Sequence, residues 1–203
     1  MKAPKFQIRA DPAYLEAFAE IMSRIDSALG KRRKGVPVAV IVAGGAALHL
    51  YTGARVSKDI DAEIKTRFLP PDDLQVSYRG PDGHSRLLYF DTQYNTSYAL
   101  LHENAEEEAY PIQVKGVNPR KLDVRLLSPL DLAVSKLSRF EGHDREDILA
   151  LARLGLIDAK SLRKRAEEAL PGYVGNVERV RNSIDIASRL VEKEEKRAAR
   201  AAK

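Results

Sequence analysis

The chain contains no cysteine, and it contains no apolar run long enough to span a bilayer. Without cysteine there is no disulfide framework and no thiol chemistry, which fits a reducing compartment. The first residues run into a charged amphipathic stretch rather than into an apolar core, so they predict no secretory signal. We therefore expect a cytoplasmic protein without a membrane partner.

Two further classes of site find no support. The spacing of the four histidines matches no zinc site; they are His49, His84, His102 and His143. Ser57 has no histidine nearby with which it could pair, so a hydrolytic triad is not indicated. The chemistry of this chain has to come from carboxylates, basic side chains and glycine turns.

The 203 residues fit one ordinary domain, or a compact domain with a helical appendage, and 44 % of them are apolar. The formal charge is +5 and the pI is near 9.3. Such an excess suits an anionic partner, either nucleic acid or nucleotide phosphates. Part of it lies in residues 31–34 and 193–203, however, and runs of this kind are usually solvated.

Hydrophobic periodicity predicts a small mixed sheet followed by helices. Helices are expected at residues 12–29, where Asp11 caps the start, and at 46–51. Strands are expected at 36–42, 59–64, 74–79, 86–90, 110–115 and 121–126. Four more helices follow at 128–140, 144–154, 161–169 and 174–191. The predicted class is α/β (α+β), with a core over 1–127 and a helical C-terminal region over 128–203.

Asp59 and Asp61 stand two apart on the predicted strand 59–64, so both side chains project from the same face. Neighbouring carboxylates repel each other unless a cation lies between them. Hard oxygen ligands of this kind suit Mg²⁺ or Mn²⁺. The alternative is an ordinary solvated strand face, because Glu63 continues the same alternation.

Gly44 and Gly45 follow a buried strand and precede a short helix. Glycine at such a turn allows a phosphate to approach backbone N–H groups at the positive end of the helix. The alternative is a tight turn without a ligand. A phosphate cradle and a carboxylate pair within twenty residues together indicate metal-assisted phosphoryl or nucleotidyl transfer.

These residues resemble a known family. Gly44-Gly-Ala-Ala-Leu48 followed by Arg55-x-Ser57-x-Asp59-Ile-Asp61 is similar to the first motif of nucleotidyltransferase-fold proteins of the AbiEii kind, the toxins of bacterial toxin–antitoxin and phage-exclusion pairs. A second block of that family, a helix bearing a lysine and then Arg…Asp-x-x-Asp, resembles Lys136, Arg139 and residues 144–147. The two blocks stand in the same order, and the resemblance covers residues 38–154.

The resemblance implies a metal-dependent nucleotidyltransferase that transfers NMP from an NTP to a macromolecule, either an RNA such as tRNA or a protein. It also implies a cognate antitoxin. The expected metal ligands are Asp59 and Asp61, for Mg²⁺ or Mn²⁺. The expected catalytic residues are Asp59, Asp61, Asp91 and Lys136. The expected nucleotide-binding residues are Gly44, Gly45, Arg55, Ser57, Lys136 and Asp144.

Two departures from the family pattern leave a second hypothesis open. The wider superfamily usually has Gly-Ser where this chain has Gly44-Gly45, so one hydroxyl contact to phosphate is missing. The third carboxylate is also ambiguous, with Asp91 as first choice and Asp123 as second. The alternative function is a nucleotidyltransferase-fold module that binds a nucleotide, RNA or a partner without catalysing transfer.

Lys136 also has two interpretations. Apolar neighbours at helical spacing place its stem along apolar surface, with the ammonium directed toward an edge. That ammonium either contacts nucleotide phosphates or pairs locally with Asp131 or Asp147. Asp144 and Asp147 likewise suit a helix N-cap or first turn, where the helix dipole stabilises acids.

Overall fold

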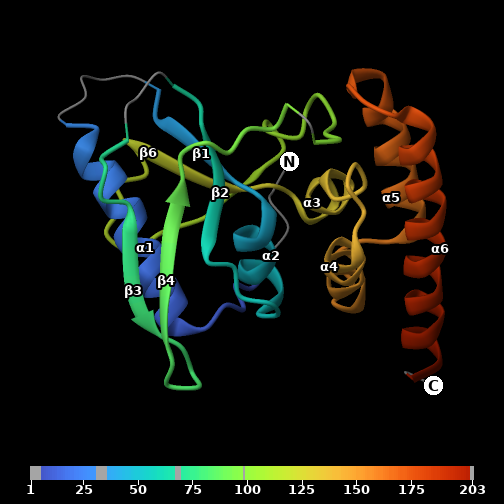
Figure 1. The fold of residues 1–203 in the computed structure, drawn as a ribbon, viewed down its shortest axis with the longest axis horizontal. Coiled ribbons are helices and arrows are strands. Elements are labelled where there is room, and N and C mark those ends of the chain that lie inside the picture. The colour runs from blue at the N-terminus through green and yellow to red at the C-terminus, as the bar shows by residue number, and fades with distance from the viewer. Residues whose placement is uncertain (1–5, 31–35, 67–69, 98, 202–203) are drawn as a thin grey trace. The chain divides into compact units, whose positions relative to one another are not determined.

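The computed structural model describes residues 6–30, 36–66, 70–97 and 99–201, and the chain divides into two compact units. Unit 1 comprises residues 1–95 and 109–127, and unit 2 comprises residues 96–108 and 128–203. Each unit is described by itself below (Figure 1). The basic run at 31–34 lies outside the described residues.

Unit 1 is built on a six-stranded mixed sheet, which confirms the predicted fold class. The strands lie in the order β3 (Gln75–Arg79), β4 (Ser85–Asp91), β2 (Asp59–Ile64), β1 (Val38–Val42), β6 (Leu122–Leu126) and β5 (Tyr110–Pro111). Strand β2 pairs in parallel with β4, β1 pairs in parallel with β6, and the other pairings are antiparallel. Strand β2, which carries the paired aspartates, is therefore an interior strand and not an edge.

Two helices pack on this sheet. Helix α1 (Pro12–Ala28) contacts β3 and β4, and helix α2 (Gly44–Thr52) contacts β2. The predicted cap of α1 is confirmed, since the Tyr14 N–H donates to Asp11 Oδ1 at 3.0 Å. One face of the sheet is buried, while on β2 the alternate residues 59, 61 and 63 remain half-buried. The buried set on β2 and β4 is Ile60, Ala62, Leu88 and Phe90.

Unit 2 consists mainly of helices, as expected. Helix α6 packs against both α4 and α5, and Figure 1 shows α5 and α6 side by side. The apolar stripe predicted for the last helix is its buried side: Val180, Ile184, Ala187 and Val191. The elements are α3 (Pro129–Ser135), α4 (Gly142–Arg153), α5 (Ala159–Ala169), the 3₁₀ turn η1 (Leu170–Gly172) and α6 (Val177–Ala201). Within the described ranges, no helix combines the length and apolar character needed to cross a membrane.

Two predicted elements are shorter than expected. The strand predicted at 110–115 is regular only over Tyr110–Pro111, and the Ile112 N–H still donates to the Val124 carbonyl at 2.9 Å. The helix predicted to reach Phe140 ends at Ser135, because the next amides bond three residues back instead of four. The hydroxyls of Ser135 and Ser138 also donate to the carbonyls of Leu132 and Ser135, a local competition that weakens a helix. Lys136 is thus the C-cap of α3.

Candidate functional site

The aspartate pair projects from a rigid part of unit 1. Asp59 and Asp61 lie on β2, between the paired strands β1 and β4. Ile60 and Ala62 anchor the strand, being 0 % and 3 % exposed. Both carboxylates are half-buried on the opposite face, so they are accessible to a ligand while their backbone is held by two neighbouring strands.

The register of the sheet distinguishes between the two candidates for a third carboxylate. Asp91 on β4 is the direct parallel partner of Asp61, which places both side chains on the same face of adjacent strands. Asp123 lies on β6, two strands from β2, where it pairs with Ala39 of β1. Its Oδ2 accepts from Arg125 Nε at 2.7 Å. Asp91 is therefore the neighbour of the pair.

The Asp91 carboxylate is nevertheless engaged elsewhere. Its Oδ1 accepts from the Gln93 N–H at 2.9 Å, which closes a turn after β4. Over the residues that the structure describes, no group of three or more His, Cys, Asp or Glu side chains is arranged to hold a metal ion. Asp59 and Asp61 could supply carboxylate oxygens to a metal ion, and the Oδ1 atom of Asp91 is engaged by the Gln93 N–H. One or two carboxylates, completed by phosphate oxygens and water, is the usual protein share of a Mg²⁺ site.

The glycine turn packs directly against this pair. Gly44 has φ +54°, and a Cβ built on it would lie 1.8 Å from Asp61 Oδ2. The Ala43 N–H donates to the Asp61 carbonyl at 2.8 Å, and no side chain caps the start of α2. The amino end of α2 and the Asp61 carboxylate are therefore adjacent. A side chain at position 44 would fill the space between them.

Gly45 is restricted by a different neighbour. A Cβ at this position would lie 2.5 Å from Ser57 Oγ and 3.5 Å from Arg55 Nη2. The Ser57 hydroxyl occupies the space into which a serine at position 45 would extend, so the departure from Gly-Ser has a steric reason. Sequence reasoning missed this packing, because it depends on a contact between Gly45 in the first turn of α2 and Ser57 in the loop after that helix.

Ser57 and Arg55 have different positions at the site. Ser57 is buried, and its hydroxyl donates a short hydrogen bond to Asp59 Oδ1. It therefore orients the Asp59 carboxylate, and contact of Ser57 with a nucleotide stays a prediction. Arg55 is exposed, and its guanidinium lies beside Gly45, where it adds positive charge to the start of α2.

Two tyrosines border the carboxylates. Burial raises the pKa of the Tyr94 hydroxyl, and the negative charges of Asp61 and Glu63 raise it further. Burial also raises the pKa of Tyr14, with Tyr78, Asp59 and Asp61 adding to the effect. Both hydroxyls stay protonated at neutral pH, so they add no further negative charge to the pair.

The second block of the resemblance lies in unit 2 and forms a buried ionic network. Lys136 Nζ donates to Asp147 Oδ2 at 2.7 Å and lies 3.9 Å from Asp144 Oδ1. Arg139 binds both oxygens of Asp144 at 2.9 Å. Lys136, Asp144 and Asp147 are 7 %, 1 % and 4 % exposed. The local partner of Lys136 is thus Asp147, while Asp131 pairs with Arg165 at 2.7 Å.

Asp144 also has a structural role at the start of α4. Glu141 is the N-cap of that helix, and the Asp144 carboxylate accepts its backbone N–H at 3.0 Å in a capping box. Asp144 is therefore the third residue of the first turn and not the cap itself. Contact of Lys136 or Asp144 with a nucleotide stays a prediction.

The arrangement in unit 1 fits a divalent cation that is shared with a phosphate chain. Two carboxylates face outward, an uncapped helix start lies next to one of them, and Arg55 lies beside the same turn. The carboxylates suit the metal, and the backbone N–H groups with the guanidinium suit phosphate oxygens. These parts are those required for chemistry at a phosphorus centre.

Comparison with known proteins gives one match. A family model described as "Nucleotidyltransferase of unknown function (DUF6036)" matches residues 16–196. Neither the curated proteins nor the solved structures give a match to the chain. The matched range includes the glycine turn, the aspartates of β2 and β4, and the helices of unit 2.

Proposed function

Because the chain belongs to this family of nucleotidyltransferases, we propose that it transfers a nucleoside monophosphate from an NTP to a macromolecular acceptor with the help of Mg²⁺ or Mn²⁺. The observation that carries the proposal is the contact between the glycine turn and the aspartate pair. The start of α2 lies against the Asp61 carboxylate with no room for a side chain between them. A nucleotide phosphate at the helix start would thus lie beside the carboxylates that hold its cation.

Each residue of the site has a proposed part. Asp59 and Asp61 bind the divalent cation, and Ser57 holds Asp59 in its orientation through their hydrogen bond. The backbone at Gly44 and Gly45, together with Arg55, receives the triphosphate. A bound cation would neutralise charge that builds up on the phosphate oxygens during transfer.

The reaction balances without a redox partner. A hydroxyl oxygen of the acceptor forms a bond to the α-phosphorus, the bond from that phosphorus to the bridging oxygen breaks, and pyrophosphate leaves. The hydroxyl proton passes to a base. Asp91 is the proposed base or a third ligand, since it is the strand neighbour of Asp61. Its Oδ1 accepts from the Gln93 N–H, and its second oxygen is the one proposed for either part.

An RNA acceptor is favoured over a protein by the basic balance of the chain, +5 at pH 7. The resemblance to AbiEii-like toxins extends the proposal to a toxin role and a cognate antitoxin. That role is separable from the chemistry. Co-expression of neighbouring genes tests it, whereas the transfer assay tests the reaction.

The transfer assay uses purified protein, each α-labelled NTP in turn, Mg²⁺ or Mn²⁺, and total bacterial RNA or lysate protein. The control is the Asp59→Asn/Asp61→Asn variant, which keeps the shape of both side chains and removes their charge. We expect label on a macromolecule with the wild type and none with the variant. Equal labelling by both proteins would refute the assignment of the pair.

One observation favours the second candidate function, a nucleotide-binding module without transfer activity. Asp91 is bound to the Gln93 N–H, and no three-carboxylate group forms in the part of the chain that the structure describes. In that case calorimetry would detect Mg²⁺-dependent NTP binding by the wild type, while the transfer assay would detect no label on RNA or protein.

A further inference from the structure

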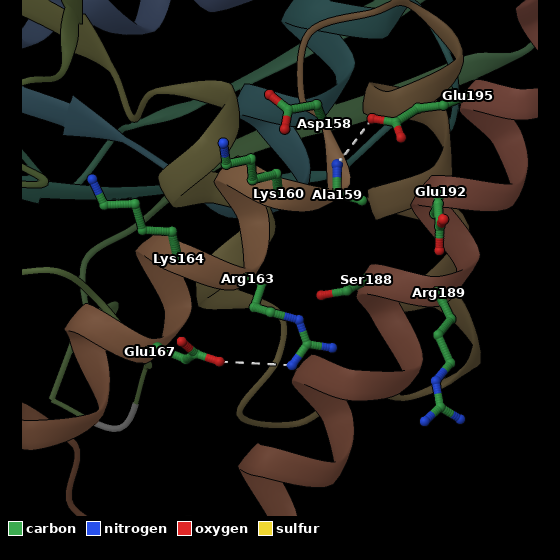
Figure 2. Close-up of a pocket in the computed structure, with 10 residues that line it drawn as sticks. All are labelled: Asp158, Ala159, Lys160, Arg163, Lys164, Glu167, Ser188, Arg189, Glu192 and Glu195. Carbon is green, nitrogen blue, oxygen red and sulfur yellow. Dashed lines mark hydrogen bonds and ion pairs between the residues drawn. The ribbon is translucent and has the colours of Figure 1, made fainter.

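Two of the hollows that the described residues of unit 2 form differ in their charge. The larger, about 610 Å³, lies between α5 and α6 (Figure 2). Its lining contains four cationic and four acidic side chains, and most are already paired with each other or with neighbours. Arg163, for example, lies 2.6 Å from Asp185 and 3.6 Å from Glu167. This groove has no surplus charge to attract a ligand.

The second hollow, about 500 Å³, has a strong excess of arginine. We call it the arginine hollow. Its single acid, Glu178, is 87 % exposed at the side chain and lies 4.0 Å from Arg181, which is outside the hollow. The lining residues are Arg139, Phe140, Arg145, Asn176, Glu178, Arg179, Asn182, Ser183 and Ile186.

Each of the three guanidinium groups is held by a contact that leaves N–H donors available. Arg145 lies over the Phe140 ring, with its Cζ 4.8 Å from the ring centroid, a cation–π contact that uses the face of the guanidinium and not its N–H donors. Arg139 uses Nε and Nη2 for Asp144. Arg179 Nη2 donates to the Arg139 carbonyl at 3.0 Å. Because these contacts already hold the three arginine side chains, binding a ligand costs less of their conformational entropy.

The backbone between α3 and α4 brings these groups together. Phe140 is buried and has φ +52°, a conformation that bulky L-residues rarely adopt. The turn is closed by the hydrogen bond from the Phe140 N–H to the Lys136 carbonyl, at 2.9 Å. It carries Arg139 and the aromatic platform for Arg145 to the same hollow. Unusual backbone held by its surroundings is a frequent mark of a binding site.

We propose that the arginine hollow binds phosphate groups of an RNA chain, the acceptor class of the proposed reaction. The acceptor assignment rests on the proposed function, but the binding itself does not require it. One phosphate offers oxygens to more than one guanidinium fork at once, and successive phosphodiesters provide closely spaced charges for Arg145 and Arg179, while the charge of Arg139 is already balanced by Asp144. The start of α6, capped by Asn176 at the same hollow, adds its positive end.

The test measures RNA binding without NTP or metal, so a failure of catalysis does not affect it. Fluorescence anisotropy of a short labelled single-stranded RNA is recorded at several salt concentrations for the wild type, Arg145→Gln/Arg179→Gln and Arg189→Gln. Arg189 is an exposed arginine of α6, the helix that carries Arg179, and it does not line the arginine hollow. Arg139 is left intact because Asp144 depends on it.

We expect the double variant to bind RNA about tenfold more weakly at physiological salt, with the slope of log K against log salt reduced by about 1.4, or about 0.7 for each lost phosphate contact. Arg189→Gln should change neither value appreciably, and circular dichroism should show all three proteins folded. Wild-type affinity and slope in the double variant would overturn the proposal. So would equal weakening by Arg189→Gln, or displacement of RNA by an acidic peptide of matched charge as effective as by unlabelled RNA.

Two outcomes separate this inference from the proposed function. If label transfer occurs but RNA affinity is unaffected by the double variant, the arginine hollow is refuted and the enzyme stands. If no label is transferred but the double variant loses RNA affinity, the hollow stands and the transferase proposal fails.

Discussion

Asp59 with Asp61, and Asp144 with Asp147, are closely spaced aspartate pairs that occupy opposite environments. The pair on β2 is half-buried and faces outward; the Ser57 hydroxyl donates to Asp59, and the glycine turn packs against Asp61. The pair on α4 is almost fully buried and bound by Lys136 and Arg139. Spacing alone therefore does not reveal function. The two pairs differ in exposure, which the spacing does not encode.

The buried pair, Asp144 and Asp147, stabilises unit 2. Its charges are balanced inside the unit, two cationic side chains against two carboxylates, and one of the carboxylates also closes the first turn of α4. Breaking such a network strands a charge in a medium that solvates it poorly. The outward pair of unit 1 is the proposed site of a divalent cation from solution.

The largest expected effect is the loss of transfer when the outward pair loses its charge. Asp61→Asn should lower the rate of label transfer by at least a factor of about 100, because charge stabilisation at the reacting phosphate is the main contribution of such a site. The same variant should change the free energy of unfolding by less than about 1 kcal/mol. Both are measured on one preparation, by the labelling assay and by urea denaturation. Normal labelling would show that Asp61 belongs to a solvated strand face.

The next largest effect is on stability. Lys136→Met keeps the length of the side chain but leaves Asp147 without its ammonium partner, and we expect unfolding to become easier by about 3–5 kcal/mol. Urea denaturation measures the change. Lys164→Met is the matched control, since Lys164 is 74 % exposed and lies 3.8 Å from Glu168. Its effect should stay below about 1 kcal/mol. An unchanged stability with reduced NTP binding would instead assign Lys136 to the nucleotide.

A third prediction concerns the glycine that makes room for Asp61. Gly44→Ala adds a Cβ that would lie 1.8 Å from Asp61 Oδ2, so the carboxylate must move. Gly30→Ala is the matched control, with φ +64° and no atom within 4 Å of the added Cβ. The control should lose about 1–2 kcal/mol of stability from backbone strain alone. Gly44→Ala should lose about 1–3 kcal/mol more and should also weaken NTP binding. Equal losses in the two variants would show that the turn tolerates a side chain.

The local sequence pattern was sufficient to predict strand β2 and the start of helix α1. The period-two alternation of residues 59–64 predicted β2 and its outward carboxylates, and Asp11-Pro12 predicted the start of α1. Both follow from nearest-neighbour geometry, which a short stretch of chain encodes.

Other features depend on long-range pairing. The position of Asp91 beside Asp61 depends on the register of β4 on β2, and the packing of Ser57 against Gly45 depends on a contact between the first turn of α2 and the loop after that helix. No local pattern contains such information. The early end of α3 was missed for a different reason. Lys136 has apolar neighbours at helical spacing, and the serine hydroxyls that compete for backbone carbonyls at Ser135 and Ser138 were not weighed.

The smallest expected effect is on the pH dependence of stability, and it belongs to the buried pair. Burial by itself raises the pKa of Asp144, but the hydrogen bonds from Arg139 and from the Glu141 N–H outweigh burial and hold the pKa below its ordinary value. Because the folded pKa is the lower one, this carboxylate stabilises the fold fully above the unfolded pKa of about 3.9. The contribution is lost as the pH falls through the folded pKa.

Asp144→Asn removes this contribution, so the variant should be less stable than the wild type at neutral pH, and the difference should narrow below about pH 4. Urea denaturation of both proteins at a series of pH values measures that difference. The capping role of Asp144 is to accept the Glu141 N–H, and the side-chain oxygen of an asparagine at the same position also accepts it. A difference that stays constant with pH would therefore assign the role of Asp144 to hydrogen-bond geometry and not to its charge, and would remove the electrostatic contrast between the two aspartate pairs.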